Sequence, residues 1–267
     1  MVDAARRFGG VARIYGDGAL EALARAHVCV IGVGGVGSWA AEALARSGVG
    51  QLTLIDLDHV AESNVNRQVH ALGSTLGAAK VDVMRERIAD ISPDCRVRAI
   101  DDFVTVENVE RLVPEGALVV DAIDAPREKA ALVASMRRRR QPMIVCGGAG
   151  GRTDPLRLRR DDLSRTKGDA LLAAVRARLR REHGFPRDAA KRFRIEAIWS
   201  DEHPGRAARE AACEPDVRGG EGGRGGAPLG CAGYGSLVTV TAAMGLAAAS
   251  WAIERALSEA NRAARTG

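Results

Sequence analysis

Short apolar runs alternate with helix-like segments along the first half of the chain. The runs at 27–32 and 51–56 flank an alanine-rich segment, 35–47, that ends at a Ser-Gly pair. This order is typical of a βαβ unit. A further apolar run at 119–124 predicts another buried strand. We therefore expect an α/β fold with a Rossmann-like, mainly parallel sheet flanked by helices and a mixed C-terminal extension.

Length and the change in composition along the chain predict one domain. A chain of 267 residues with 46% hydrophobic content can bury one large core. We place the nucleotide-binding core at about 20–150 and a crossover region at about 151–258.

Glycines cluster directly after the first apolar run. Without β-carbons, Gly34 and Gly35 let backbone N–H groups approach phosphates, and a helix beginning near Gly35 adds its positive end. Asp56 ends the next run, about 20 residues further on, where such folds place the acid that bonds a ribose hydroxyl. This spacing indicates a nucleotide site but leaves the nucleotide open.

The loop after Asp56 favours a triphosphate over a dinucleotide. A dehydrogenase normally turns into a helix here, whereas this chain continues through polar residues that include a second acid, two amides, an arginine and a glutamine. They are Asp58, Asn64, Asn66, Arg67 and Gln68. Amide and guanidinium donors suit phosphate oxygens. Lys80, in a helix preceded by glycines, is expected to add a mobile point charge.

Asp124 closes the apolar run at 119–124. Ligands of open α/β sheets bind outside the carboxyl ends of the strands, so Asp56 and Asp124 should face one crevice. A carboxylate there suits a magnesium ion that bridges phosphates. We therefore take Asp124 as the candidate magnesium ligand.

Several separated motifs together resemble one family. GxGGxGS from Gly32, DxDxVxxSNxNRQ from Asp56 and DAxD from Asp121 are similar to the ATP-using HesA/MoeB/ThiF superfamily, relatives of ubiquitin-activating enzymes. Five further segments resemble its TcdA (CsdL) branch, the tRNA threonylcarbamoyladenosine dehydratases. They are 7–16, 67–72, 101–103, 147–151 and 231–235. The resemblance covers roughly residues 6–258 and is poorest at 200–226.

The resemblance implies roles for the residues above. Gly34, Gly35 and Asp56 would hold the nucleoside, and Asp124 the magnesium of bound ATP. The phosphates would be held by Asn66, Arg67 and Lys80. Arg13 matches an arginine that superfamily homodimers contribute to the partner's phosphates.

The resemblance also implies an activity and partners. ATP would activate the carboxylate of threonylcarbamoyladenosine next to the anticodon of a tRNA, and an atom of the modification would close a ring with loss of water. The CsdL name in relatives further implies a possible sulfur-transfer partner protein.

The cysteine pattern excludes some site types. Cys29 and Cys146 fall in strand-like runs and are expected to be core thiols of a cytoplasmic, disulfide-free protein. No C-x-x-C pair occurs, so we expect no zinc site. The crossover at 164–200 has no cysteine, which disfavours a covalent intermediate. Cys213 lies in a loop, and Cys231 precedes a predicted helix start that would lower its thiol pKa. We expect neither to be covalent.

Basic residues are concentrated in the second half. Residues 152–194 carry 14 Lys and Arg against 6 Asp and Glu, a surplus larger than the +5 of the whole chain. Such a surface suits a polyanion such as tRNA, although solvated helix faces and a coding bias explain the composition equally well. Arg137–Arg140 forms a second basic run with the same two readings. Few aromatics, 3%, argue against a base-stacking platform.

Two C-terminal segments have open interpretations. The glycine-rich stretch 201–228 predicts a loop near the crevice, either a lid or a plain loop. The apolar stretch 231–253 is long enough for a membrane span but is dominated by small residues, so we expect a buried helix and no stable membrane insertion.

Three other functions compete with the dehydratase. One is adenylation of the C-terminus of a ubiquitin-like sulfur carrier, which the missing cysteine pairs disfavour. Another is a nicotinamide-dependent oxidoreductase, in which the polar loop after Asp56 would have no use. The third is a non-catalytic tRNA-binding module, in which the phosphate-holding groups would be idle.

Overall fold

The core is a seven-stranded sheet with the order β3-β2-β1-β4-β5-β7-β6. The computed structural model describes residues 3–16, 18–205 and 234–266. All neighbouring strands pair in parallel except β6 and β7, which are antiparallel at one edge. The strands are β1 (His27–Ile31), β2 (Gln51–Ile55), β3 (Arg96–Ile100), β4 (Leu118–Asp121), β5 (Met143–Cys146), β6 (Leu158–Asp162) and β7 (Glu196–Ser200).

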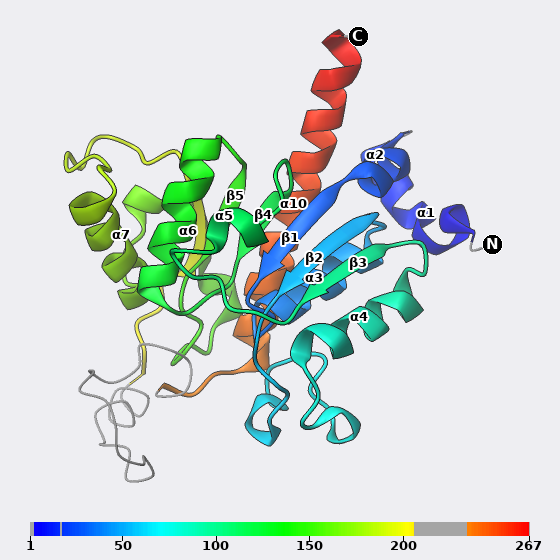
Figure 1. The fold of residues 1–267 in the computed structure, drawn as a ribbon, viewed down its shortest axis with the longest axis horizontal. Coiled ribbons are helices and arrows are strands. Elements are labelled where there is room, and N and C mark those ends of the chain that lie inside the picture. The colour runs from blue at the N-terminus through cyan, green and yellow to red at the C-terminus, as the bar shows by residue number, and fades with distance from the viewer. Residues whose placement is uncertain (1–2, 17, 206–233, 267) are drawn as a thin grey trace.

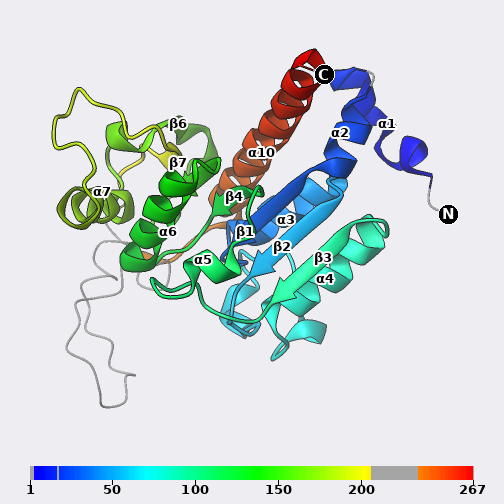
Figure 2. The same cartoon turned by 45° about the horizontal axis from the view of Figure 1, so that its top comes forward.

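Helices cover both faces of this sheet (Figures 1 and 2). One face carries α2 (Ala19–Arg25), α3 (Gly37–Arg46), α4 (Lys80–Ile91) and the long α10 (Val238–Thr266). The other carries α5 (Val109–Leu112), α6 (Pro126–Arg139) and α7 (Ala170–Glu182). The short α1 (Ala4–Tyr15) packs beside α2. Single 3-10 turns lie at Glu62–Asn64, Gly73–Thr75, Pro155–Arg157 and Leu163–Arg165.

The inner strands β1, β2, β4, β5 and β7 have near-continuous buried runs because both of their faces are covered. Val28, Val30 and Leu52 point into one hydrophobic cluster, while Cys29 and Ile55 point into the other. This alternation follows from the two-residue repeat of a strand. The doubly wound sheet therefore has two cores, one on each face.

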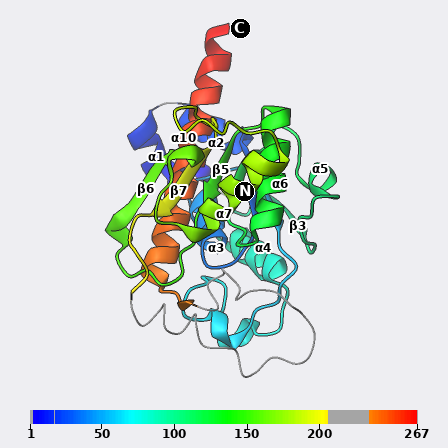
Figure 3. The ribbon, with the colours of Figure 1, turned by 90° about the vertical axis from the view of Figure 1, so that its left-hand side faces the viewer.

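The last helix spans the sheet and packs on the first crossover helix. α10 contacts α3 as well as β4, β5 and β7, and Trp251 is buried at its centre. Gly245 makes the crossing possible, because a β-carbon there would collide with the carbonyl oxygen of Val36. The far end of α10 extends past the sheet, as Figure 3 shows.

The structure confirms the predicted fold class and shifts several boundaries. The crossover helix begins at Gly37 rather than near Gly35, and the final helix begins at Val238 rather than soon after Cys231. The run predicted as a strand to Asp124 stops at Asp121, and the next residues form a turn into α6. Within the described ranges, none of the helices is both long and apolar enough to cross a membrane.

Candidate active site

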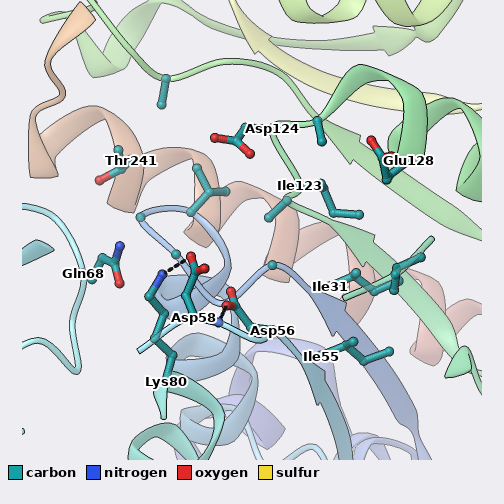
Figure 4. Close-up of a pocket in the computed structure, with 18 of the residues that line it drawn as sticks. Ile31, Ile55, Asp56, Asp58, Gln68, Lys80, Ile123, Asp124, Glu128 and Thr241 are labelled. Carbon is teal, nitrogen blue, oxygen red and sulfur yellow. Dashed lines mark hydrogen bonds and ion pairs between the residues drawn. The ribbon is translucent and has the colours of Figure 1, made fainter. Parts of the chain in front are cut away.

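A cavity of about 490 Å³ opens at the carboxyl ends of the parallel strands. It lies where the strand order reverses between β1 and β4, the place where open α/β sheets bind ligands. Figure 4 shows Asp56, Asp58 and Lys80 on one side of this cavity and Asp124 on the other. The expectation that Asp56 and Asp124 face one crevice agrees with this arrangement.

The glycine turn after β1 requires its glycines. Gly32 has a φ of +83°, and a β-carbon there would lie 2.9 Å from the carbonyl group of Ala122. At Gly37 a β-carbon would collide with the carbonyl oxygen of Gly32. No side chain caps the start of α3, so the positive end of this helix is left for a ligand. Gly34 and Gly35 line the cavity.

Asp56 is held by backbone groups. One carboxylate oxygen accepts the Val33 N–H at 2.6 Å and the other accepts the Asp58 N–H at 2.9 Å. Burial raises the pKa of Asp56, while nearby Lys80 opposes that rise. Each oxygen keeps a second lone pair, so the side chain can still accept from a ligand hydroxyl.

Lys80 is the first residue of α4 and is buried, not mobile as the sequence indicated. Its Nζ lies 2.7 Å from an oxygen of Asp58, which is itself more than half exposed. The sequence interpretation failed because a lysine looks the same whether its stem is buried or solvated. The Lys80 ammonium group is therefore held in position before any ligand binds.

The side chains of the polar loop after Asp58 line the cavity, bond to backbone groups of the loop, or do both. Asn64 is buried, and its side-chain oxygen accepts the Ala61 N–H at 3.0 Å. Arg67 lines the cavity and donates to the Ser63 carbonyl at 2.6 Å. Gln68 also lines it, with a buried side-chain oxygen that has no hydrogen-bond partner among the described residues. A ligand donor would satisfy that oxygen.

Asn66 has a different role from its neighbours. It does not line the cavity, and its amide nitrogen donates to the carbonyl of Ser236 at 2.8 Å, just before α10. Its side-chain oxygen accepts from Arg67 at 3.0 Å. In this structure Asn66 orients Arg67 and ties the loop to the last helix.

Asp124 faces the cavity from the turn after β4. Its exposed carboxylate forms neither a hydrogen bond nor an ion pair with any residue that the structure describes. The acid at the strand end is instead Asp121, which is fully buried and ion-paired with Lys129 at 2.8 Å. Lys129 also donates to the Ile123 carbonyl at 2.8 Å, which fixes the turn leading to Asp124.

A second wall of the cavity, residues 147–150 with Leu171, was not assigned from sequence. The glycines there contributed only to the family resemblance, although a glycine run after an apolar run is the same signal as the one after β1. Thr241 also lines the cavity, with its methyl group 3.3 Å from the β-carbon position of Gly35. No local signal marks Thr241, because it comes from a helix about 200 residues away.

Arg13 lies away from the cavity of its own chain. It is exposed on α1 and does not line the cavity. Neighbouring Arg7 donates to carbonyls at the C-terminal end of α4, and Phe8 lies against Gly48, just after the end of α3. These contacts place α1 near the amino-terminal ends of the strands, at the end of the sheet opposite the cavity. A role for Arg13 in a nucleotide site therefore requires a second copy.

The basic surplus at 152–194 does not form one free surface. Arg152 is buried, and Arg176 is half-buried and donates to Thr166. Arg180 stacks over the Phe193 ring at 5.2 Å, and Arg137 stacks over Phe185 at 4.2 Å. The sequence alone counted all of these charges as part of a basic surface, whether solvated or facing tRNA. Burial and ring contacts explain several of them without nucleic acid.

None of the cysteines that the structure describes lines the cavity. Cys29 and Cys146 are buried, and burial raises the pKa of the Cys146 thiol to about 12. Cys213, Cys231 and most of the glycine-rich segment lie outside the described residues. Among those described, no three His, Cys, Asp or Glu side chains gather as a metal cluster.

Comparison with known proteins gives one consistent result. The ThiF family matches residues 6–266. The tRNA threonylcarbamoyladenosine dehydratase of Escherichia coli is 44% identical over 262 residues, 96% of each chain, and that of Haemophilus influenzae is 42% identical over 95% of this chain and 94% of its own. The E. coli enzyme, TcdA, solved with ATP, superposes with a TM-score of 0.84 at 42% identity over 98% of both chains. Its AMP complex gives 0.85 with the same identity and coverage. The chain belongs to the ThiF family, as its motifs indicated.

Proposed function

We propose that this chain is an ATP-dependent tRNA threonylcarbamoyladenosine dehydratase. The observation that carries the proposal is the match, over nearly the whole length, to dehydratases whose solved structures hold ATP and AMP. The cavity supports it independently, because a glycine turn, an acid at a strand end and two fixed cations line one crevice. These groups suit a nucleoside triphosphate.

The lining of the cavity suggests one orientation for ATP. Ile31, Ile55 and Ile123 form an apolar end that suits the adenine ring. Asp56 lies next to them and would accept from the ribose hydroxyls. The phosphates would then run past the glycine turn toward Arg67 and Lys80, whose positive charges are already fixed.

Magnesium fits the donor set on the opposite side. Asp124 offers an exposed carboxylate that none of the described residues engages. Hard oxygen donors of this kind, with phosphate oxygens and water, are what magnesium prefers. The metal would neutralise charge on the phosphates, and Asp124 would orient it.

The chemistry needs no protein nucleophile. An oxygen of the substrate carboxylate bonds to a phosphorus of ATP and displaces the rest of the phosphate chain. A nitrogen or oxygen of the same modification then attacks the activated carbon and loses its proton, while the bond from that carbon to the phosphorus-linked oxygen breaks. The ring closes with net loss of water, and Arg67 and Lys80 stabilise the charge on the departing group.

A homodimer would complete the site. Arg13 is exposed far from its own cavity, next to exposed Ile14 and Tyr15, which suits a contact with another copy. In a two-fold dimer each Arg13 would reach the partner's phosphates. We further place the enzyme in the cytoplasm, with its ATP and tRNA. A sulfur-transfer protein remains a proposed partner on the strength of the resemblance.

The tRNA backbone would contact cations near the cavity. Arg127, in the first turn of α6, is exposed, and so is Lys167, just before α7. The arginines at the C-terminal ends of α6 and α7 lie at the end of the sheet opposite the cavity. Binding of tRNA should weaken log-linearly with salt, and Arg127→Glu with Lys167→Glu should weaken it more than Arg181→Glu with Arg187→Glu.

Mass spectrometry of tRNA nucleosides tests the function directly. Protein, ATP and magnesium should remove one water from threonylcarbamoyladenosine, and omission of ATP should prevent the loss. Calorimetry should also show ATP binding without comparable NAD binding. Unchanged tRNA together with adenylation of a sulfur-carrier C-terminus would replace this proposal with the alternative.

A further inference from the structure

A buried ion pair behind the second wall, Arg152 with Asp169, hydrogen-bonds to both backbone groups of Gly148. Asp169 accepts the Gly148 N–H at 2.8 Å, and Arg152 donates from Nε to the Gly148 carbonyl at 3.0 Å. The two charged groups lie 3.6 Å apart, with side chains 4% and 0% exposed. Gly148 itself lines the cavity, so the pair fixes the wall from behind.

The same pair joins segments that are distant in sequence. Asp169 caps α7 by accepting the Leu172 N–H at 2.8 Å. Arg152 donates to the carbonyls of Gly168 and Glu202. The Glu202 carboxylate in turn accepts the backbone N–H of Thr153 at 2.9 Å. Charged hydrogen bonds shielded from water give this wall a defined position.

The wall presents backbone rather than side chains to the cavity. Its residues 147–150 are three glycines and one alanine. A β-carbon at Gly147 would collide with Asp169 and lie 2.9 Å from the Trp199 β-carbon, so this position must remain glycine. The guanidinium of Arg152 is buried, where it donates to three carbonyls and pairs with Asp169, so it does not contact a ligand in the cavity.

These features suit the flat, uncharged base of a nucleoside, because no charged side chain faces the cavity from this wall. The phosphates of ATP are assigned above to Arg67 and Lys80, across the crevice. We propose that residues 147–150 form the subsite for the modified nucleoside, and that Arg152 and Asp169 are positioning residues that fix this subsite through Gly148. The proposal rests on the proposed function and names the place of its second substrate.

Two substitutions probe the subsite in different ways. Asp169→Asn keeps the shape and the α7 cap but removes the charge that holds Arg152 and the Gly148 N–H. Gly148→Ala leaves the ion pair intact, since its new methyl group would meet Asp169 at 3.9 Å and Leu171 at 4.0 Å, which is ordinary contact. Each should raise KM for tRNA or lower kcat by on the order of tenfold, with KM for ATP within about twofold of wild type.

A matched control is available in Asp162. This carboxylate is also buried and accepts backbone N–H groups, from Ser164, Phe193 and Arg194, but it lies at the far end of β6 and does not line the cavity. Asp162→Asn should lower the unfolding temperature and leave both KM values and kcat unchanged. Arg152→Lys, which keeps the charge but loses the guanidinium fork, should fall between wild type and Asp169→Asn.

The outcomes separate the two proposals. If the wild-type protein does not dehydrate the tRNA, the proposed function fails and this inference fails with it. If the wild type is active and folded Asp169→Asn and Gly148→Ala match it, only the inference is overturned. Equal losses for ATP and tRNA would also overturn it, because the wall would then serve the whole cavity.

Discussion

The two walls of the cavity are built on opposite plans. The first wall, at 32–36 and 56–68 with Lys80, presents charged and polar side chains. The second wall presents backbone and keeps its charges buried behind it, in Arg152 and Asp169. On the first wall, charged side chains would touch the phosphates, whereas a surface for an uncharged base needs a fixed shape. Both walls contain ion pairs, but only the first wall places charged side chains in the cavity.

The largest effect is expected where an ion pair is most completely buried. Lys129→Met would leave Asp121, which is fully buried, with one backbone donor, the Ile123 N–H at 3.1 Å. Urea unfolding should show a loss of about 3–5 kcal/mol. Arg152→Met should cost less, because Asp169 keeps two backbone donors. If Arg152→Met lost as much unfolding free energy as Lys129→Met, or more, this ranking of the two buried ion pairs would be wrong.

A pH-dependent loss of stability should follow from His70, a buried histidine two residues after Gln68 of the first wall. Burial, with Lys80 and Arg87 as further causes, lowers the pKa of His70 from 6.5 to about 4. Between those values the unfolded chain binds a proton that the folded chain does not. The folded state is therefore unpenalised above about pH 6.5 and loses about 3 kcal/mol as the pH falls toward 4.

Urea unfolding at pH 7 and pH 4.5 measures this loss. His70→Asn should flatten the dependence, and His203→Asn, at an exposed histidine, is the control. An unchanged slope in His70→Asn would assign the acid sensitivity to other groups.

Asp124 tests whether catalysis depends on charge shown to the ligand. Asp124→Asn should lower kcat by on the order of 10²-fold, because it removes the proposed metal-binding charge. The unfolding temperature should stay unchanged, since the carboxylate bonds to none of the described residues. Turnover near wild type, measured at saturating magnesium, would move the metal to another residue such as Glu128, which also lines the cavity.

The smallest effect is expected for the cysteines. Cys213→Ser with Cys231→Ser should leave ATP-dependent dehydration within about twofold of wild type, because ring closure needs no thiol. The assay is the same loss of water from tRNA. Inactivity of the folded double variant would indicate a covalent intermediate and would favour the carrier-protein alternative.

The sequence predicted the first wall better than the second for a physical reason. Gly34, Asp56 and Arg67 lie in motifs whose spacing follows from one βαβ unit, so local pattern was enough. The contacts of Lys80 and Arg152 depend on where distant segments pack. Lys80 was therefore taken as mobile and Arg152 as part of a basic surface, although both are buried.

Boundaries show the same limit. β4 ends at Asp121 because Lys129, eight residues on, draws its carboxylate and the following turn together. α10 begins at Val238, beyond the glycines that suggested an earlier start. Apolar pattern located each element, but tertiary contacts set where it stopped.

The packing of α10 on α3 at Gly245 has a consequence for folding of the nascent chain on the ribosome. α10 is synthesised after every other element that the structure describes, yet it covers one face of β4, β5 and β7 and brings Thr241 to the glycine turn. Until it leaves the ribosomal tunnel, the apolar surfaces of α3, β4, β5 and β7 that it packs on stay exposed. The nascent chain should therefore acquire its nucleotide affinity only once α10 has emerged and packed on α3.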